Sequence, residues 1–280
     1  PLTTFATIAI GSKRPVLLAP AMHEPMYEHP IVLENLRKLE ARGVRVISPL
    51  LEEGKAKLAD IRKIVFAVKS ALAKGTLSGK KVLVASGAFS EKIDEVRSIT
   101  NASSGKMGCA LAVACALEGA EVKMIGNGKH EEFVDFVEAH STDGLEQKVM
   151  KELAGGYDYF FCPAAIPDFE AKHVKGKIDS GKKRIIELAP RAKMLPKIRE
   201  KFPGLKIIAF KASFGKGKKE IGAAAGKFRK EGGFYAVVAN DLKKSPFGAE
   251  DAQVFFCGPK LKWLRGKKRD VAAGIARLIL

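Results

Sequence analysis

The chain has 280 residues, 46% of them apolar, and a formal net charge of +18. This apolar content is enough for two packed domains, and no run of about eighteen apolar residues offers a membrane span. The charge would suit a nucleic-acid-binding protein, but the lysines and arginines are scattered and the aromatic residues lie in apolar runs. We therefore disfavour that class and expect an enzyme that attracts anionic substrates.

The cysteine pattern indicates a reducing compartment. No C-x-x-C spacing occurs, and each cysteine lies within an apolar helix or strand pattern. We therefore expect buried, reduced thiols in a cytoplasmic protein and no zinc site. The cysteines are Cys109, Cys115, Cys162 and Cys257. We also expect no signal peptide, because the apolar segment at residues 3–10 is short and lacks a basic start.

The apolar pattern of the first 60 residues predicts an incomplete α/β domain. Strands are expected at residues 15–19 and 44–47, and an amphipathic helix is expected at residues 30–42. Two βα units cannot cover both faces of a parallel sheet, so this segment needs a partner or is the end of something larger. A helix at residues 60–74 then leads to Gly-Thr-Leu-Ser-Gly at residues 75–79, which has the composition of a linker. We place one domain at residues 1–75 and a second at residues 79–280.

The apolar pattern of the second domain predicts alternating strands and helices. Strands are expected at residues 82–85, 122–125, 157–162, 206–210, 234–239 and 253–257, and helices are expected to begin near residues 105, 143, 191 and 217. Such alternation is typical of a doubly wound, mostly parallel, Rossmann-like sheet, which binds ligands at the carboxyl ends of its strands. Gly126 and Gly128 follow the second strand, but Glu131 stands where a dinucleotide fingerprint needs its third glycine. We interpret this segment as a turn.

Residues 81–119 give the clearest candidate site. A buried strand ends at Ser86 and Gly87, a polar loop of about twenty residues follows, and a helix is expected at residues 105–117. A small-residue loop that enters a helix directs free backbone N–H groups at a ligand, commonly a phosphate. A solvated loop with a serine N-cap is the alternative. A Walker loop is excluded, because Thr100 and Met107 stand where Gly and Ser/Thr are required.

The same residues resemble a known signature. Asp94, Arg97, Ile99 and Asn101, followed by Ser-Ser-Gly-Lys-Met-Gly at residues 103–108, are similar to the signature of phosphopantothenoylcysteine synthetase, the phosphopantothenate–cysteine ligase of coenzyme A synthesis. The resemblance implies 4′-phosphopantothenate and cysteine as substrates, CTP as co-substrate, Mg²⁺ bound with the CTP, and a homodimer. The sequence leaves the choice between CTP and ATP open.

The resemblance also implies the roles of individual residues. Asn101 binds the acyl intermediate, Lys177 stabilises the α-phosphate of the nucleotide, and residues 103–106 hold a phosphate. The nucleotide-binding or substrate-binding residues that it implies are Ser103, Ser104, Gly105, Lys106, Cys162, Pro163, Ala164, Asp168, Ala189, Pro190, Phe210, Lys227 and Lys230. No metal ligand is assigned.

Two loops carry part of these assignments. Residues 162–169 resemble the family motif A-A-V-A-D-[FY], in which the carboxylate, here Asp168, accepts hydrogen bonds from the ribose or the base. Lys177 lies in a basic arm at residues 172–183, which is similar to the family's K-I-K-K flap. Such an arm can close over a triphosphate and neutralise developing charge, and a solvated charged hairpin is the alternative.

Three later motifs match the family less completely. Ala189 and Pro190 stand where the family has N-P-D, so a contact there would come from the backbone. Phe210 matches the strand end of G-F-A-x-E-T. Lys227 and Lys230 resemble the phosphate-binding K-L-x-x-K that precedes V-A-N-D, although the spacing differs.

Residues 20–27 resemble the P-x-M-N-x-x-M-W motif of flavin-dependent phosphopantothenoylcysteine decarboxylase. His23 and Tyr27 replace the family's Asn and Trp, and the flap at residues 52–58 lacks the acid Cys. The alternative interpretation is that His23 and His29 are ordinary loop histidines without a role in a decarboxylase site. The resemblance implies a partial flavodoxin-like segment in front of the synthetase. We expect FMN binding and decarboxylation only if the missing N-terminal part is present, so a bifunctional protein is the alternative function.

Overall fold

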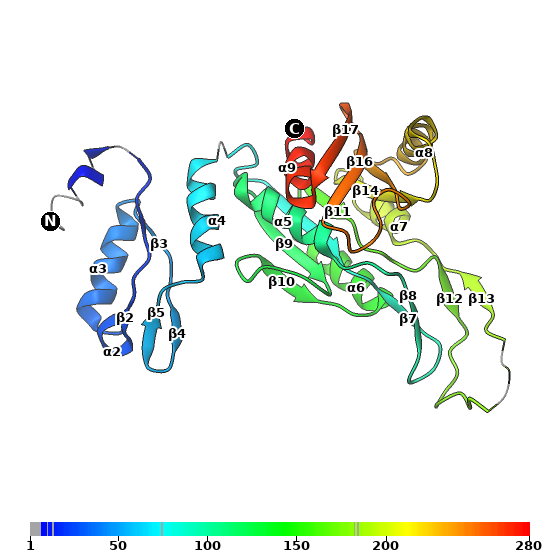
Figure 1. Ribbon diagram of the computed structural model, residues 1–280, viewed down its shortest axis with the longest axis horizontal. Coiled ribbons are helices and arrows are strands. Elements are labelled where there is room, and N and C mark those ends of the chain that lie inside the picture. Colours follow the sequence, from blue (N-terminus) through cyan, green and yellow to red (C-terminus); the bar gives the residue numbers. More distant parts are fainter. Residues whose placement is uncertain (1–6, 10, 13, 74, 182, 184) are drawn as a thin grey trace. The chain divides into compact units, whose positions relative to one another are not determined.

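The computed structural model describes residues 7–9, 11–12, 14–73, 75–181, 183 and 185–280. The chain forms two compact units, Pro1–Gly75 and Thr76–Leu280 (Figure 1). Among the described residues, no helix has the length and apolar character that a membrane crossing needs.

The first unit is a small α/β arrangement. The expected strands are β1 (Leu17–Leu18) and β3 (Arg45–Val46), which pair in parallel, and the expected helix between them is α3 (Pro30–Ala41). The flap at residues 52–58 belongs to a hairpin of β4 (Leu50–Glu52) and β5 (Lys55–Lys57), which also pairs with β2 (Met22–His23). The unit also contains α2 (Glu24–Tyr27) and α4 (Ile61–Leu72).

Little apolar surface is buried within this unit. Its cluster of buried residues consists of Ile47, Ala59 and Ala67. Helix α4 exposes four apolar side chains at helical spacing, namely Ile61, Val65, Val68 and Leu72. This small buried cluster and the exposed apolar face of α4 are what we expect of a segment that does not bury both faces of its sheet by itself.

The second unit is built on one large sheet. Among the described residues, eight strands follow the order β10-β9-β6-β11-β14-β15-β16-β17. Strands β10 to β15 in this order pair in parallel, and the last two join antiparallel. Their bounds are β6 (Lys81–Ser86), β9 (Glu121–Gly126), β10 (Asp135–Glu138), β11 (Tyr159–Cys162), β14 (Lys206–Ser213), β15 (Ala236–Asp241), β16 (Asp251–Cys257) and β17 (Leu261–Lys267). The mostly parallel sheet confirms the predicted fold class.

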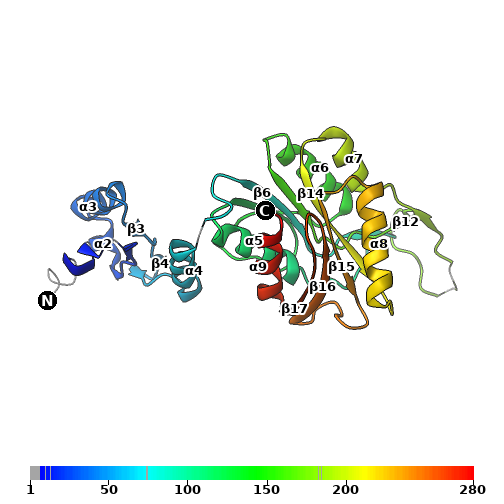
Figure 2. The same cartoon turned by 90° about the horizontal axis from the view of Figure 1, so that it is seen from above.

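Helices cover both faces of this sheet (Figure 2). Helices α5 (Lys106–Leu117) and α9 (Lys268–Leu278) pack on one face, where Leu111 and Ile275 belong to the same core cluster as Val84 of β6. Helices α6 (Thr142–Leu153), α7 (Met194–Lys201) and α8 (Lys218–Glu231) pack on the other face, in a second core cluster that includes Leu83, the neighbouring residue of the same strand. Consecutive strand residues therefore enter different cores, as a sheet that is buried on both faces requires.

Several features of the second unit differ from the expectations. The polar loop after Gly87 contains a hairpin of β7 (Ser90–Lys92) and β8 (Ser98–Thr100). The segment expected as a basic arm is the far end of an antiparallel ribbon of β12 (Phe169–Ala171) and β13 (Leu188–Pro190). The two hairpins lie side by side (Figure 1). The apolar pattern also did not predict β10 at one edge of the large sheet, or β17 and α9 after residue 257.

The expected linker is partly packed into the second unit. The side chain of Leu77 is fully buried in the core beneath α5 and α9. The backbone N–H of Leu77 donates to the carbonyl of Glu118 (2.9 Å), and the Thr76 hydroxyl donates to the Glu118 carboxylate (2.8 Å). Thr76 and Leu77 are therefore the first packed residues of the second unit. Lys74, the last residue of the expected helix at 60–74, lies outside the described residues.

Candidate functional site

Two adjoining cavities lie among the described residues at the carboxyl ends of the parallel strands. The α5 cavity has a volume of about 150 Å³ and is lined by residues 103–107 at the start of α5, by the ends of β14 and β15, and by Lys268. The α7 cavity has a volume of about 330 Å³ and lies between the end of β11 and helices α7 and α8. Ala164 and Phe210 line both cavities. Ligands in the two cavities would therefore meet at these two side chains.

The start of α5 forms one wall of the α5 cavity. Gly105 is the N-cap, has a φ of 70°, and provides no side chain to satisfy the first N–H groups of the helix. The serine N-cap considered as the alternative is therefore wrong. The positive φ explains the glycine, since other residues adopt this conformation at a cost. The uncapped N–H groups and the helix dipole favour an anion at this end of α5.

Lys106 is held at the rim of the α5 cavity. Its ammonium group donates to the carbonyl of Gly248 (2.9 Å) and forms an ion pair with the carboxylate of Glu250. Ser103 and Ser104 line the same cavity, as does Asn240 at the end of β15. The residues predicted to hold a phosphate therefore lie together on one cavity wall.

Small residues at the end of β11 separate the two cavities. Pro163 lines the α5 cavity, Cys162 lines the α7 cavity, and Ala164 lines both. The carbonyl of Ala165 accepts from the N–H of Phe89 (3.1 Å), which ties this loop to the loop after β6. Burial raises the pKa of the Cys162 thiol to about 12, so this cysteine is a packing residue rather than a nucleophile.

The α7 cavity combines apolar walls with charged residues at its mouth. Phe210 of β14 and Phe228 of α8 supply aromatic surface. Asp168 is exposed at the mouth and pairs with Lys193 at 3.4 Å. Lys227 and Lys230 are exposed on α8 and lie outside both cavities, although Phe228 and Glu231 of the same helix line the α7 cavity.

Asp94 and Arg97 of the signature hold the segment that carries Lys177. The carboxylate of Asp94 is buried and accepts from the backbone N–H groups of Val96 (2.8 Å), Arg97 (2.6 Å) and Ile178 (3.0 Å). The Arg97 guanidinium pairs with Asp94 at 2.9 Å and donates to the Ile178 carbonyl at 3.0 Å. The hydrogen bond from Ile178 is the largest of the contacts that lower the pKa of Asp94 to about 2.

The two residues with implied catalytic roles lie outside both cavities. Lys177 is exposed on the arm next to Ile178. Asn101 is half-buried in the loop after β8, where its carbonyl accepts from the N–H of Ser103 (2.9 Å). Ala189 and Pro190 are exposed in β13 and also lie outside the cavities. Lys182 and Arg184, which belong to the expected basic cluster, lie outside the described residues.

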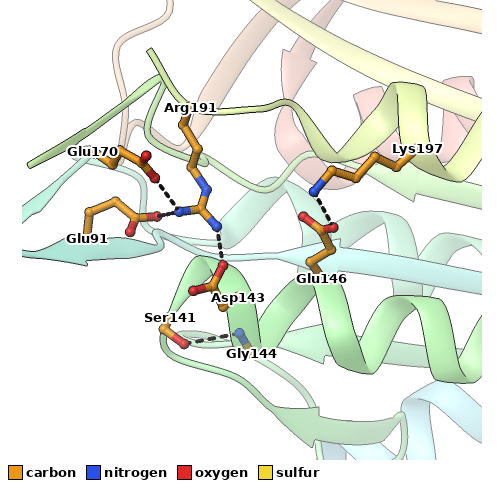
Figure 3. Close-up of polar contacts among 8 residues, drawn as sticks. All are labelled: Glu91, Ser141, Asp143, Gly144, Glu146, Glu170, Arg191 and Lys197. Carbon is orange, nitrogen blue, oxygen red and sulfur yellow. Dashed lines mark hydrogen bonds and ion pairs between the residues drawn. The ribbon is translucent and has the colours of Figure 1, made fainter. Parts of the chain in front are cut away.

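Sequence reasoning missed Arg191, which joins three separate segments (Figure 3). Its side chain is 13% exposed and pairs with Glu91 of β7 (3.2 Å), with Glu170 of β12 (3.1 Å), and with Asp143 at the start of α6. Arg191 also lines the α7 cavity. The only available signal was its position directly after Pro190, because its three partners lie 21 to 100 residues away along the chain.

Comparison with known proteins shows what the chain is similar to. Residues 77–280 match the family model described as the DNA/pantothenate metabolism flavoprotein C-terminal domain, and residues 1–73 match the flavoprotein model. The chain is 41% identical to the coenzyme A biosynthesis bifunctional protein CoaBC of Thermococcus kodakarensis, covering 97% of this chain and 68% of that protein. It is 32% identical to the protein of the same name from Methanocaldococcus jannaschii, covering 99% of this chain and 69% of that protein.

Two solved structures have a fold similar to that of this chain. The C-terminal domain of a coenzyme A biosynthesis bifunctional protein CoaBC superposes with a TM-score of 0.60 at 26% identity, over 74% of this chain and 96% of that one. The DNA/pantothenate metabolism flavoprotein from Streptococcus pneumoniae gives a TM-score of 0.63 at 23% identity, over 72% of this chain and 98% of that one.

Proposed function

Because this chain belongs to the family of bifunctional coenzyme A biosynthesis proteins, we propose that its second unit is a ligase that joins 4′-phosphopantothenate to cysteine with CTP. The observation that carries the proposal is the pair of cavities that meet at Ala164 and Phe210. One cavity offers a helix N-terminus and lysines for a phosphate, and the other offers aromatic walls and a carboxylate for a nucleoside. The reaction would take place where the two cavities adjoin.

Two chemical steps are needed, because hydroxide is too poor a leaving group for a carboxylate to condense directly with an amine. In the first step, the carboxylate of 4′-phosphopantothenate attacks the α-phosphate of CTP, and pyrophosphate leaves. In the second step, the amine of cysteine attacks the acyl carbon of the resulting acyl-cytidylate, and CMP leaves. The first step needs charge stabilisation at the α-phosphate, and the second needs the acyl group held in place.

The described residues supply groups for both steps. In the α7 cavity, the nucleoside would lie on Phe210 and close to the small residues Cys162 and Ala164, with Asp168 accepting from a ribose hydroxyl. Pro163 would contact the ligand from the α5 cavity. In the α5 cavity, residues 103–106 would hold a phosphate. The remaining nucleotide contacts proposed from the family are Ala189, Pro190, Lys227 and Lys230.

Lys177 and Asn101 would act from loops beside the cavities. Lys177 lies on an exposed arm that is anchored next to it, at Ile178, so closure of the arm would bring an ammonium group to the α-phosphate. The Asn101 amide would hold the acyl group. Mg²⁺ would arrive with CTP, because among the described residues no three acidic, His or Cys side chains are grouped to hold a metal. Mg²⁺ commonly takes most of its ligands from phosphate and water.

We also propose a homodimer in the cytoplasm. The ribbon of β12 and β13 and its arm expose several large apolar side chains, namely Phe169, Val174, Ile185, Ile186 and Leu188. A second copy would remove this surface from water. The four cysteines are buried and unpaired, which suits a reducing compartment.

FMN and decarboxylation are proposed only for a protein that also carries the rest of the flavoprotein domain. The family match of residues 1–73 supports the decarboxylase part. This chain's own flap has no Cys to serve as a proton donor. Instead, Lys57 at the flap pairs with Glu53 at 2.8 Å. His23 and Tyr27 lie on β2 and α2, and His29 caps α3 by accepting from the N–H of Ile31 at 3.3 Å.

Rapid-quench kinetics separate the proposed roles of Lys177 and Asn101. Lys177→Gln should slow pyrophosphate release from CTP and phosphopantothenate about a hundredfold, with or without cysteine, because a transition-state cation is lost. Asn101→Ala should retain more of the pyrophosphate burst and lose the cysteine-dependent step. A wild-type rate in Lys177→Gln would show that the arm is only a charged surface loop. Equal loss of both steps, each measured separately, would contradict a role of Lys177 that is specific to the first step.

A further inference from the structure

The α5 cavity contains a second lysine that no sequence motif indicates. Lys268 is the first residue of α9 and lines the same cavity as Lys106, the first residue of α5. The two helices pack on the same face of the sheet. Two cationic side chains, each from the first turn of a helix, therefore approach one small cavity.

Glu250 connects these two lysines. Its carboxylate pairs with the ammonium group of Lys106, and its carbonyl accepts from the backbone N–H of Lys268 at 2.9 Å. Within the described part of the chain, no carboxylate lies within ion-pair distance of the Lys268 ammonium group. Burial, and then the nearby charge of Lys106, lower the pKa of Lys268, and the charge of Glu250 opposes this shift without cancelling it. Two cations thus line the cavity, and Glu250, which pairs with Lys106, is not part of its wall, so an incoming anion gains more there than at a neutralised surface.

The counter-charge on Lys106 is easily replaced. The Glu250 side chain is 80% exposed, whereas that of Lys106 is 32% exposed. An ion pair with such an exposed partner contributes little stability, because water and salt screen it. A phosphate group bound between Lys106 and Lys268 would accept hydrogen bonds from both ammonium groups and from the start of α5.

The size and lining of the α5 cavity indicate which kind of phosphate compound it can bind. Its volume of about 150 Å³ is less than half that of the α7 cavity. Its other walls include Pro163, Val238 and Val254, with Asn240 as a polar side chain. This lining suits a short chain with amide groups that ends in a phosphate monoester, and it suits a nucleotide less well.

We infer that Lys268 binds the phosphate monoester of 4′-phosphopantothenate together with Lys106, and that this phosphate displaces the exposed Glu250 carboxylate from Lys106. The inference rests on the proposed ligase function and deepens it. Lys268 thereby becomes a specificity residue, since pantothenate, which ends in a hydroxyl group, cannot pair with two ammonium groups.

Steady-state kinetics of the full chain test this assignment. Lys268→Gln should raise the KM for 4′-phosphopantothenate about tenfold to a hundredfold, the usual effect of losing a charge-assisted hydrogen bond. The KM for CTP should stay within about twofold. Lys267→Gln is the matched control, because Lys267 is exposed next to Lys268 and does not line the cavity. Glu250→Gln should lower the KM for 4′-phosphopantothenate by up to about fivefold.

Calorimetry with 4′-phosphopantothenate and with pantothenate gives a readout that is independent of catalysis. Wild-type protein should prefer the phosphorylated compound, and Lys268→Gln should lose most of that preference. An unchanged preference and KM in Lys268→Gln, with wild-type ligase activity intact, would overturn the inference and leave the proposed function standing. An increase in the KM for CTP alone would also overturn it. Lys268-dependent binding without pyrophosphate formation would instead contradict the ligase and support the phosphate site.

Discussion

Gly108 sets how closely helix α5 approaches strand β6. A Cβ atom at this position would lie 2.1 Å from the Ser86 hydroxyl oxygen, which is buried and donates to the carbonyl of Gly105 at 3.1 Å. The last glycine of the signature is therefore explained by packing. It allows the N–H groups of α5 to reach the edge of the sheet where a ligand would bind.

Gly108→Ala should lower the free energy of unfolding by ~1–3 kcal/mol, because the added methyl group must push α5 or Ser86 aside. Gly226→Ala is the control. Gly226 lies inside α8 with open space around its Cβ position, so alanine there should stabilise the helix by ~0.5–1 kcal/mol. Urea unfolding of both variants measures the two effects. A stable Gly108→Ala variant would show that the contact with Ser86 is not restrictive.

Arg191 should matter for stability through its three carboxylate partners. Arg191→Met leaves Glu91, Asp143 and Glu170 facing one another without a cation, and we expect a loss of about 2 kcal/mol in the free energy of unfolding. Arg191→Lys keeps the charge but loses the planar fork, so its loss should be intermediate. Denaturant unfolding at low and high salt checks this order. Equal stability of all three proteins would mean that the cluster is merely solvated.

At the scale of elements, the antiparallel ribbon of β12 and β13 depends on contacts from distant parts of the chain. Its base is joined to β7 and α6 through Arg191, and its far segment is joined to the turn after β7 through Asp94. Contacts of this kind explain why the sequence predicted a mobile arm and a polar loop instead of two hairpins. Their stability comes from partners about eighty residues apart, which apolar periodicity does not report.

Asp94→Asn should loosen the segment that carries Lys177. The carboxylate has a pKa of about 2 in the folded chain, below its usual 3.8, so it adds stability above about pH 4 and loses that contribution as the pH falls toward 2. The variant should therefore be less stable at neutral pH and should lose this part of the acid dependence. Thermal unfolding between pH 6 and pH 2 measures both.

Limited trypsin digestion gives a second readout of the same change. Cleavage at Lys175 and Lys177 should be faster in Asp94→Asn than in wild type, because the hydrogen bond to Ile178 is weakened. Asp179→Asn, an exposed substitution on the same arm, should digest like wild type. Identical digestion of all three proteins would contradict the proposed anchoring role.

At the scale of the whole molecule, the sequence predicted the central strands because buried parallel strands are continuous apolar runs. It missed the edge strand β10, and it missed β17 and α9, where Lys and Arg interrupt the apolar pattern on both sides of Trp263 and Leu264. Motifs predicted residues 103–106, Ala164 and Phe210 of the cavity walls, because those residues are close in the chain or recur in the family. The roles of Arg191 and Lys268 could not be predicted from the sequence, because the residues that they contact or approach are distant along the chain.

Leu77 defines where the second unit starts. We expect a fragment of residues 76–280 to fold and to bind CTP without the first unit. A fragment of residues 78–280 loses the fully buried Leu77 side chain and should be less stable by about 2–4 kcal/mol. Urea unfolding of the two fragments and of Leu77→Ala in the full chain measures this difference. If the two fragments are equally stable, and Leu77→Ala is as stable as the wild-type chain, Leu77 is part of the linker and not of the second unit's core.

Pyrophosphate release in the absence of cysteine tests the central proposal most directly. The full chain, mixed with CTP, Mg²⁺ and 4′-phosphopantothenate, should release a single stoichiometric burst of pyrophosphate and retain the acyl-cytidylate. Added cysteine should then release CMP and start turnover. Pyrophosphate that forms only when cysteine is present, or a nucleoside diphosphate and inorganic phosphate as the products, would contradict activation by nucleotidyl transfer.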